Sequence, residues 1–476
     1  MTVELDRDLQ ARQEARCLSR RAKEAQRRLA SFSQEQIDGI CTAIAKAFSE
    51  KAEWLARMAV EETGFGNAAD KTEKNLFASE TVLHRILPMK TAGVLKRDTS
   101  QKLWEIGVPM GVVAGIVPST NPTSTVCYKA LICLKAGCTV VFSPHPKAAK
   151  CTLEAAKIVA RAAEAAGAPE GSVGCLSIPS MAGCQELMAA PEVNLILATG
   201  GPGMVKAAYS SGKPAIGVGA GNGPAYIHRS ADVNHALSCI LQSKTFDNGT
   251  VCASEQSMIV ERCMEEKVRK AASAMGFYFM DSSQAGMLAK LLFKPTGGLN
   301  PEIVGKTAGQ LARMAGFTVP EGTKILVARE QEAGPTRPYS MEKLCPVLAF
   351  FVMENEDAVL DKAVEVLTHE GSGHTFSFHG TDEQAITRFA MAIPVSRFLV
   401  NTPSALGGIG KTTGLFPALT LGCGAVGGSS SSNNISPMDL INIRRVAWGT
   451  ETPETAAVIS DDLVERLTEQ ILKRLN

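Results

Sequence analysis

One cysteine, Cys252, stands in a setting that could support nucleophilic chemistry. It follows an Asp-Asn-Gly turn within the segment 244–258 and precedes an apolar, strand-like run at 257–260. A cysteine nucleophile needs a lowered pKa or a nearby base, together with donors for the oxyanion that develops. Most of the other twelve cysteines lie in apolar segments and are predicted to be reduced, buried thiols, so the position beside a turn singles out Cys252.

Length and composition exclude several classes of protein. The 476 residues are 45% hydrophobic and 20% charged, which is enough apolar material for two domain cores. The formal net charge is +1 and positive and negative residues are mixed along the chain, so no basic patch of the kind that binds nucleic acid is expected. We also expect no signal peptide, no membrane span and no metal site, because long apolar runs are absent and the seven histidines do not cluster with cysteines.

Apolar strands alternate with helices along most of the chain. Two or three helices are predicted within 3–62, one of them starting at the capping box Ser33–Gln36. From residue 111, strands are predicted at 111–117, 139–142, 193–198, 257–260, 324–328, 347–352, 374–378 and 395–400. Helices are predicted between them at 123–135, 147–166, 264–275, 357–367 and 382–391. Buried strands separated by helices indicate an α/β protein with parallel sheets.

Four short loops follow predicted strands of the first sheet. They are small, polar or glycine-rich and lie at 118–122, 143–146, 199–203 and 217–223. Ligands of parallel sheets bind at the carboxyl ends of the strands, and glycine lets the backbone approach a ligand closely. These loops are therefore predicted to form a binding site opposite Cys252.

The segment around Cys252 resembles the active-site segment of a known enzyme family. Residues 245–256 are similar to that segment in the CoA-acylating branch of the aldehyde dehydrogenase superfamily, especially the acetaldehyde and propionaldehyde dehydrogenases of bacterial microcompartments. Further motifs of the family occur in the family's order at 117–125, 142–146, 198–204, 217–222, 342–347, 373–374 and 419–424. An ordered set covering roughly residues 30 to 450 is far more specific than any one motif.

The resemblance implies an aldehyde dehydrogenase-like fold with two parallel-sheet α/β domains and a β oligomerisation arm. A cofactor and CoA-binding domain would comprise 1–94 and 107–230 with 419–428, and a catalytic domain would comprise 231–418. The arm would be formed by 95–106 and 429–450, and a linker with an amphipathic helix would follow at 451–476. The family implies a homodimer or a homotetramer.

The resemblance also assigns catalytic roles. The Cys252 thiolate would attack the aldehyde carbon, while Asn121 and the backbone N–H of Cys252 would hold the alkoxide. His374 is the family's histidine near the cysteine and a candidate to accept a proton from Cys252 or CoA, although a generic histidine at a strand start is more often a core or surface residue. No role is expected for Glu255.

NAD, with NADP as an alternative, and CoA are the implied cofactor and co-substrate. Glu342 would hold the nicotinamide ribose by analogy. The segment 143–146 departs from the Lys-x-x-Glu pattern of hydrolytic relatives, which leaves NAD versus NADP open. The remaining predicted cofactor-binding residues are Pro118, Ser119, Thr120, Ser143, Pro144, His145, Pro146, Thr199, Gly200, Gly201, Met204, Gly217, Val218 and Gly219.

Gly217 decides which acceptor is expected. Hydrolytic relatives carry a glutamate base in a Glu-Leu-Gly-Gly segment, and glycine stands at the matching place here. Without that base, the acyl group is expected to pass to CoA rather than to water. The alternatives are a hydrolytic enzyme with another base and a non-catalytic cargo or scaffold protein. The aldehyde, whether acetaldehyde, propionaldehyde or an anionic one such as sulfoacetaldehyde, stays open.

The C-terminal segment points to a partner. Apolar residues recur on one side of the predicted helix after Ser460, at Leu463, Val464, Leu467 and Ile471. Such a helix cannot stand alone in water. It is expected either to dock on its own or a neighbouring subunit or to bind a microcompartment shell protein. The second reading places the enzyme in the bacterial cytoplasm, inside a microcompartment.

Overall fold

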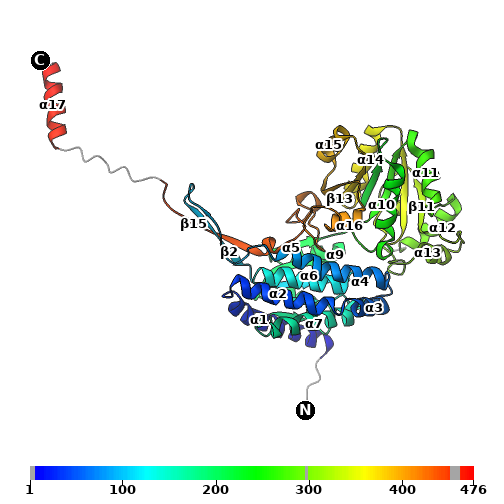
Figure 1. Cartoon of the computed structure of the whole chain (residues 1–476), viewed down its shortest axis with the longest axis horizontal. Helices are drawn as coiled ribbons and strands as arrows, with labels where there is room; N and C mark the ends of the chain where they lie inside the picture. Colours follow the sequence, from blue (N-terminus) through cyan, green and yellow to red (C-terminus); the bar gives the residue numbers. More distant parts are fainter. Residues whose placement is uncertain (1–5, 295–297, 451–460, 476) are drawn as a thin grey trace, which may run out of the picture.

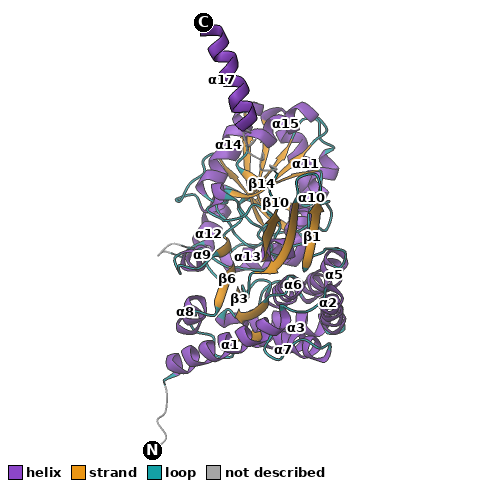
Figure 2. Ribbon diagram, turned by 90° about the vertical axis from the view of Figure 1, so that its left-hand side faces the viewer, coloured by secondary structure: helices purple, strands orange, loops and turns teal. Residues whose placement is uncertain are grey.

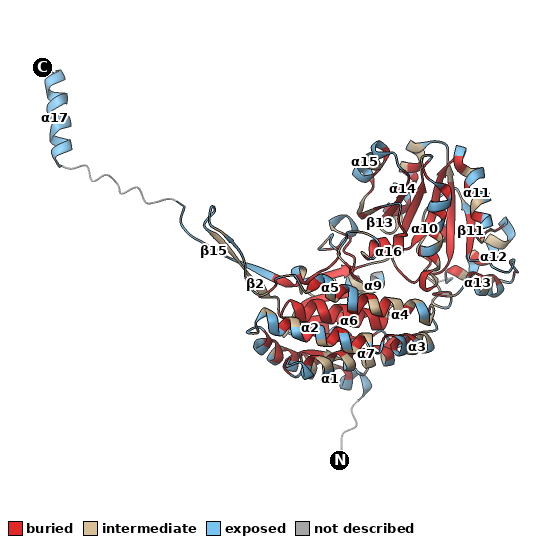
Figure 3. Ribbon diagram, viewed as in Figure 1, coloured by how far each residue is buried: buried red, intermediate tan, exposed pale blue. Residues whose placement is uncertain are grey.

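Two α/β bodies and a projecting β-ribbon make up the molecule (Figure 1). The computed structural model describes residues 6–294, 298–450 and 461–475. The first body holds α1 to α9, and the second holds α10 to α16. Figure 2 shows the strands of the two bodies lying between layers of helices, and Figure 3 shows that most of these strands are buried while the outer helix faces and the β-ribbon are exposed.

A five-stranded parallel sheet forms the centre of the first body, in the order β5-β4-β3-β6-β7. Its strands are β3 (Val112–Ile116), β4 (Thr139–Ser143), β5 (Val173–Cys175), β6 (Val193–Thr199) and β7 (Ala215–Val218). The helices are α1 (Arg7–Leu29), α2 (Gln34–Ser49), α3 (Ala52–Thr63), α4 (Ala68–Leu76), α5 (Val82–Ile86), α6 (Pro122–Lys135), α7 (Ala149–Ala165), α8 (Met181–Ala189) and α9 (Pro202–Tyr209).

Local sequence explains how the central helix α6 begins. Pro122 occupies its first turn, where the missing N–H costs nothing, and Asn121 is the N-cap residue. The Asn121 side chain makes no capping hydrogen bond, so its amide is available for other contacts. Every residue of α6 is buried, because α6 packs between the sheet and α2. The capping box predicted at Ser33 and Gln36 is confirmed at the start of α2.

A seven-stranded parallel sheet forms the second body, in the order β10-β11-β12-β9-β8-β13-β14. Its strands are β8 (Gly223–Ile227), β9 (Glu255–Glu261), β10 (Phe277–Phe279), β11 (Ile325–Glu330), β12 (Val347–Met353), β13 (Gly373–His379) and β14 (Val395–Val400). The helices are α10 (Val233–Thr245), α11 (Glu265–Ala274), α12 (Ser282–Leu292), α13 (Ala308–Ala315), α14 (Glu356–His369), α15 (Glu383–Ala392) and α16 (Ser404–Gly408).

The β-ribbon is an antiparallel sheet of three strands. It joins β1 (Gly93–Asp98) and β2 (Leu103–Pro109) to β15 (Ile441–Ala447). Trp104 and Trp448 pack edge to face on it, with ring centroids 5.0 Å apart. Residues 429–440, predicted to belong to the arm, contribute no strand to the ribbon. Ile435 and Leu440 pack instead into the core of the first body.

Two boundaries differ from those expected. Strand β8 pairs with β9 and β13, so it lies in the second sheet, although the predicted domain boundary at 230 follows it. The glycine-rich loop predicted at 217–223 starts inside β7, which pairs Gly217 with Ala198 of β6. The first difference arises because pairing partners distant in sequence decide which sheet a strand joins, and the second because Gly217, inside a short strand, resembles a loop residue.

The C-terminal helix α17 (Asp461–Leu475) forms as predicted. Its apolar residues Leu463, Val464, Leu467 and Ile471 are about half exposed. The predicted linker at 451–460, including the expected cap at Ser460, lies outside the described residues. No helix in the described part of the chain combines the length and hydropathy needed to cross a membrane.

Candidate active site

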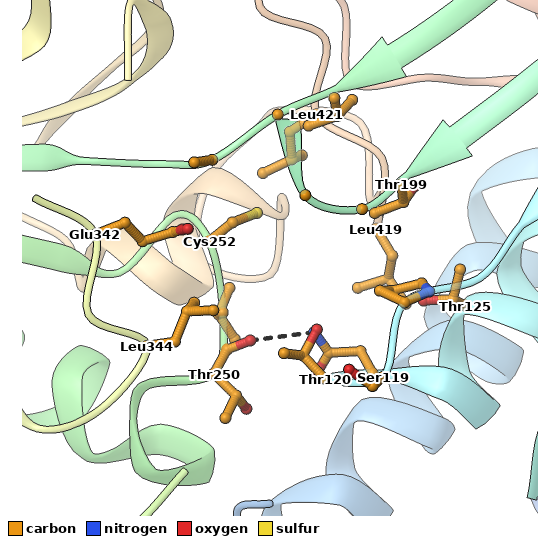
Figure 4. A pocket seen from close by; sticks show the side chains of 18 of the residues that line it. Ser119, Thr120, Thr125, Thr199, Thr250, Cys252, Glu342, Leu344, Leu419 and Leu421 are labelled. Carbon is orange, nitrogen blue, oxygen red and sulfur yellow. Dashed lines mark hydrogen bonds between the residues drawn. The ribbon is translucent and has the colours of Figure 1, made fainter. Parts of the chain in front are cut away.

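A cavity of about 240 Å³ lies where the two bodies meet. Figure 4 shows Cys252 and Glu342 on one side of it and Ser119 and Thr120 on the other. The residues lining it are Lys74, Pro118, Ser119, Thr120, Asn121, Thr125, His145, Thr199, Gly200, Gly201, Val218, Gly219, Ala220, Thr250, Val251, Cys252, Glu342, Leu344, Ile409, Leu419 and Leu421. The strand-end loops of the first sheet therefore face Cys252, as the sequence predicted.

Cys252 lies between a strained turn and strand β9. The turn is the 3₁₀ segment Phe246–Gly249, in which Asp247 and Asn248 have φ of 48° and 51°. Such values are uncommon for residues other than glycine and are kept by surrounding contacts. Burial raises the pKa of Cys252 to about 12, and the nearby Glu342 carboxyl adds to this, whereas the Arg397 guanidinium lowers it. The thiol is therefore protonated until a base removes its proton.

Asn121 presents its amide to the same cavity. Nδ2 donates to the Thr250 carbonyl oxygen at 3.2 Å and to Thr120 Oγ1 at 3.3 Å. Oδ1 accepts a hydrogen bond from Lys74 Nζ at 2.6 Å. The amide nitrogen thus lies beside the segment that carries Cys252, where a donor for an alkoxide is required.

Glu342 is the one carboxylate among the described residues that line this cavity. Its Oε1 accepts the backbone N–H of Gly221 at 2.9 Å. Burial raises the pKa of Glu342 to about 8, although the hydrogen bond from Gly221 works against the increase. At neutral pH the carboxyl is mostly protonated and is a poor base.

His374 lies behind the cavity and does not line it. Its Nδ1 is 2.8 Å from Thr375 Oγ1, while Nε2 is buried without a hydrogen-bond partner among the described residues. Burial, assisted by the Arg397 charge, lowers the pKa of His374 to about 3. The ring is therefore neutral, with a lone pair to offer.

Gly221 connects these groups, and the sequence did not single it out. A methyl group on its Cα would lie 1.9 Å from the Cys252 carbonyl oxygen and 3.3 Å from a ring carbon of His374. Only glycine fits between the Cys252 segment and His374 while donating to Glu342. The available signal was its place in the run Gly217–Gly223, which contains four glycines.

The predicted cofactor loops line two adjoining cavities. A second cavity of about 110 Å³ shares Pro118, His145, Thr199, Gly200 and Gly201 with the first. It adds the predicted residues Ser143, Pro144, Pro146 and Met204.

Two glycines of these loops test whether an extended cofactor fits. Gly201 and Gly219 line the first cavity and have no atom within 4 Å of an added Cβ. Side chains there would fill the space that an extended cofactor needs. The residues present therefore fit a nicotinamide dinucleotide or CoA.

Gly217 lines neither cavity. An added Cβ would lie 2.7 Å from Val205 Cγ1 and 2.9 Å from Tyr209 Cε2. The Tyr209 hydroxyl also accepts the Gly217 N–H at 2.9 Å. The place of a hydrolytic carboxylate is thus packed with side chains of α9.

Glu255, for which no role was expected, also lies outside both cavities and accepts the Ser404 N–H at 3.0 Å.

Comparison with known proteins identifies the family. Residues 8–276, more than half of the chain, match the model of the aldehyde dehydrogenase family. The chain belongs to this family. It is 36% identical to the succinate-semialdehyde dehydrogenase (acetylating) of Clostridium kluyveri, covering 90% of this chain and 95% of the relative. It is also 45% identical to the bifunctional aldehyde-alcohol dehydrogenase AdhE of Escherichia coli K12 over 92% of this chain. The chain spans about half the length of that bifunctional relative.

Solved structures agree with this assignment. An acetylating aldehyde dehydrogenase from Geobacillus thermoglucosidasius is 48% identical, with a TM-score of 0.92 over 94% of this chain and 99% of that one. A propionaldehyde dehydrogenase from a fucose-utilisation microcompartment of Clostridium phytofermentans is 30% identical, with a TM-score of 0.82 over 92% and 97%. The predicted family and fold class are confirmed.

Proposed function

We propose that this aldehyde dehydrogenase oxidises a short, uncharged aldehyde with NAD(P)⁺ and transfers the acyl group from Cys252 to CoA. The observation that carries the proposal is Gly217: a side chain at this position would collide with Val205 and Tyr209. The acetylating relatives described above are in accord with CoA as the acceptor.

Hydrolysis lacks a suitable base at the cavity. Glu342 has a pKa of about 8 because of its burial, and its Oε1 is occupied by the Gly221 N–H. Lys74, which lines the same cavity, donates to three acceptors. A CoA thiol is far more acidic than water, so it requires less assistance from a base.

Each residue then has a role in the transfer. His374 accepts the thiol proton as Cys252 Sγ bonds to the aldehyde carbon, because a pKa of about 3 is too low for the ring to deprotonate the resting thiol beforehand. Asn121 Nδ2 and the Cys252 N–H hold the alkoxide oxygen; one such donor is worth about 3 to 4 kcal/mol in the transition state. A bound nicotinamide supplies the hydride acceptor, with Glu342 at its ribose. The CoA sulfur attacks the resulting thioester and displaces the Cys252 sulfur, which takes up the proton that the CoA thiol gives up. The proton held by His374 passes to solvent.

The cavity lining favours an uncharged aldehyde. Leu344, Ile409, Leu419 and Leu421 provide apolar surface. The Lys74 ammonium is already engaged by Asn121, Asp247 and Thr250. An anionic aldehyde would lose its hydration on entering the cavity. Among the described lining residues, the only other group that could carry a positive charge is His145, and burial lowers the pKa of this histidine. Desolvating an unpaired charge costs several kcal/mol, so anionic aldehydes should react poorly.

An aldehyde panel tests this function. Acetaldehyde and propionaldehyde should be oxidised with CoA at least roughly 100-fold more efficiently than succinate semialdehyde or sulfoacetaldehyde. Each is assayed with NAD⁺ and with NADP⁺, with and without CoA. Sustained turnover without CoA would overturn the acyl-transfer proposal, and a preference for the anionic aldehydes would overturn the substrate assignment.

We infer further that the β-ribbon mediates homodimer or homotetramer formation. Strand β15 is an edge strand, and Ile443 and Trp448 on and beside it are 40% and 46% exposed. Edge strands with exposed apolar residues commonly pair with another chain. Light scattering of I443D/W448D should show a smaller assembly than wild type; an unchanged mass would exclude this role.

The helix α17 is proposed to bind a microcompartment shell protein and so to place the enzyme inside a microcompartment in the bacterial cytoplasm. Its half-exposed apolar face supports this docking role. Deleting residues 453–476 should leave turnover unchanged and abolish co-purification with shell protein. Loss of turnover would favour docking on the enzyme itself.

A further inference from the structure

Four polar residues of α4 and its N-cap lie on one helix face and point at the segment before Cys252. Asn67, Asp70, Lys71 and Lys74 recur at spacings of three and four, which places them one above another. Asn67 N–H donates to Asp247 Oδ1 at 2.9 Å, and Asp247 N–H donates to Asp70 Oδ2 at 2.7 Å. The helix thereby fastens the strained turn that leads to Cys252.

The two lysines share Asp247 but have different second partners. Lys71 Nζ donates to Asp247 Oδ2 at 2.8 Å and to the Thr120 carbonyl oxygen at 2.8 Å. Lys74 Nζ donates to Asp247 Oδ2 at 2.6 Å, to Thr250 Oγ1 at 3.2 Å and to Asn121 Oδ1 at 2.6 Å. Both lysines are 3% exposed and Asp247 is fully buried. Only Lys74 of the two contacts the catalytic amide.

The Lys74 contact fixes which end of the Asn121 amide faces Thr250. A flipped amide would place its NH₂ group against an ammonium, and two donors would then face each other. With Oδ1 held by the cation, Nδ2 is directed to the Thr250 carbonyl at 3.2 Å and to Thr120 Oγ1 at 3.3 Å. Both contacts are long, and an alkoxide in the cavity would take the place of one of these two acceptors. A cation on the carbonyl end also polarises the amide and strengthens Nδ2 as a donor.

Lys74 is itself held in place and charged. Its Nζ lies 5.3 Å from the centre of the Phe246 ring, a cation–π contact, in addition to its three hydrogen bonds. Burial lowers the pKa of Lys74 to about 8, while the Asp247 carboxylate raises it, so the ammonium is mostly protonated at neutral pH. With three acceptors engaged, it has no N–H left for substrate.

We propose that Lys74 is a positioning residue that orients and polarises the Asn121 carboxamide as the alkoxide donor of the Cys252 site. This inference rests on the proposed aldehyde oxidation. Asp247 anchors the ammonium, and Lys71 secures the same carboxylate without contacting Asn121. Removing either lysine leaves Asp247 paired with the other, so the two positions form a matched pair for testing.

The test compares K74M, K71M, N121A and N121A/K74M in the full chain with a turned-over aldehyde, NAD⁺ and CoA. Loss of one oxyanion donor lowers kcat by roughly 10²- to 10³-fold, which is the expectation for N121A. K74M should lower kcat by roughly 10²-fold with KM for NAD⁺ within about threefold. K71M should lose at most about tenfold, and the double variant should be no slower than N121A.

Two controls separate positioning from a structural role. Melting temperatures should fall alike in K74M and K71M, and the rate of Cys252 alkylation by iodoacetamide should match wild type in both. K74Q, whose amide can still donate to Asn121, should recover part of the activity lost in K74M. If the methionine variants do not fold, the kcat values of K74Q and K71Q are compared in the same way.

Three results would overturn the proposal. They are a K74M kcat within twofold of wild type, equal losses in K74M and K71M, and losses that multiply in the double variant. A wild-type enzyme that oxidises no aldehyde of the panel would contradict the proposed function instead, because every comparison above is made relative to wild-type turnover.

Discussion

The two sides of the Cys252 cavity treat buried polar groups in opposite ways. On the Asn121 side, the Lys74 ammonium and the Asp247 carboxylate are engaged by several partners each. On the His374 side, His374 Nε2 and Arg397 Nε are buried and have no hydrogen-bond partner among the described residues. Fully paired groups hold a fixed geometry, whereas an unpaired lone pair is available for a proton.

This difference corresponds to two kinds of catalytic task. Stabilising an alkoxide requires donors that do not move when charge develops, which is the task proposed for the Asn121 side. Moving a proton from Cys252 requires a group whose lone pair is unused at rest, which is the task proposed for the His374 side. The predictions below test the assignment of these tasks.

The largest effect is expected on the His374 side. H374A should lower kcat by roughly 10²- to 10⁴-fold, because it removes the proposed proton acceptor for Cys252. His379 is a matched control: it lies on the same strand, is buried, and has both ring nitrogens unpaired among the described residues. H379A should retain kcat within about threefold. Equal losses in both variants would show that His374 acts only through packing.

The pH profile adds a second readout for His374. Burial lowers its pKa from 6.5 to about 3, so the ring remains neutral at all pH values above about 3. Wild-type turnover should therefore show no decline attributable to this histidine as pH falls through 6.5. The same pKa shift affects stability. Below pH 6.5 the unfolded chain binds a proton at His374 and the folded chain does not, so the free energy of unfolding falls as the pH falls from 6.5 toward 3.

A smaller loss of kcat is expected for a substitution at Gly221, which lies between the Cys252 segment and His374. G221A forces a methyl group against the Cys252 carbonyl oxygen, from which it would lie 1.9 Å. Displacing the nucleophile by about 1 Å should lower kcat by roughly 100-fold. G219A is the control, because its added Cβ meets no atom within 4 Å. Since Gly219 lines the cofactor cavity, G219A should raise KM for NAD⁺ more than it lowers kcat.

Restoring a carboxylate at the hydrolytic position should not create a hydrolase. G217E must displace Val205 and Tyr209, which lie 2.7 and 2.9 Å from an added Cβ. Overpacking of this kind costs about 1 to 3 kcal/mol of unfolding free energy. Urea denaturation measures the loss, and NADH formation without CoA should stay at the wild-type level. A gain in CoA-free turnover would contradict the packing argument.

The smallest effect is expected from removing the Glu342 carboxyl, which lies near Cys252. The Glu342 carboxyl raises the pKa of Cys252, so E342Q should lower it and shift the pH profile of iodoacetamide alkylation to lower pH. KM for NAD⁺ should rise because Glu342 is the proposed ribose contact. An alkylation profile that shifts to higher pH would contradict the electrostatic coupling of these two residues.

The sequence predicted the strands and loops better than the network behind them. Apolar strands such as β3, β6 and β12 were located within a few residues, because burial on both faces leaves a largely apolar run. The three-residue strands β5 and β10 were missed, since so short a run carries no pattern. Strand β8 was assigned to the wrong side of a boundary, because pairing partners distant in sequence decide which sheet a strand joins.

Within the site, motif residues were predicted and their supports were not. The loops at 118–121, 143–146 and 199–201 line the cavities, as their position after strands indicated. The polar face of α4 resembles a solvent-exposed helix face, and only the tertiary contact with Asp247 shows that Lys71 and Lys74 are buried. His374 was predicted to be near the cysteine, yet it lies behind Gly221 rather than in the cavity.

Rapid mixing without CoA tests the central claim most directly. When enzyme, NAD⁺ and propionaldehyde are mixed, one equivalent of NADH per Cys252 should form and then stop, with propionyl mass added to the peptide that contains Cys252. Adding CoA should restore turnover and remove that mass. Continued NADH formation without CoA, or a burst that persists in C252A, would contradict acyl transfer through Cys252.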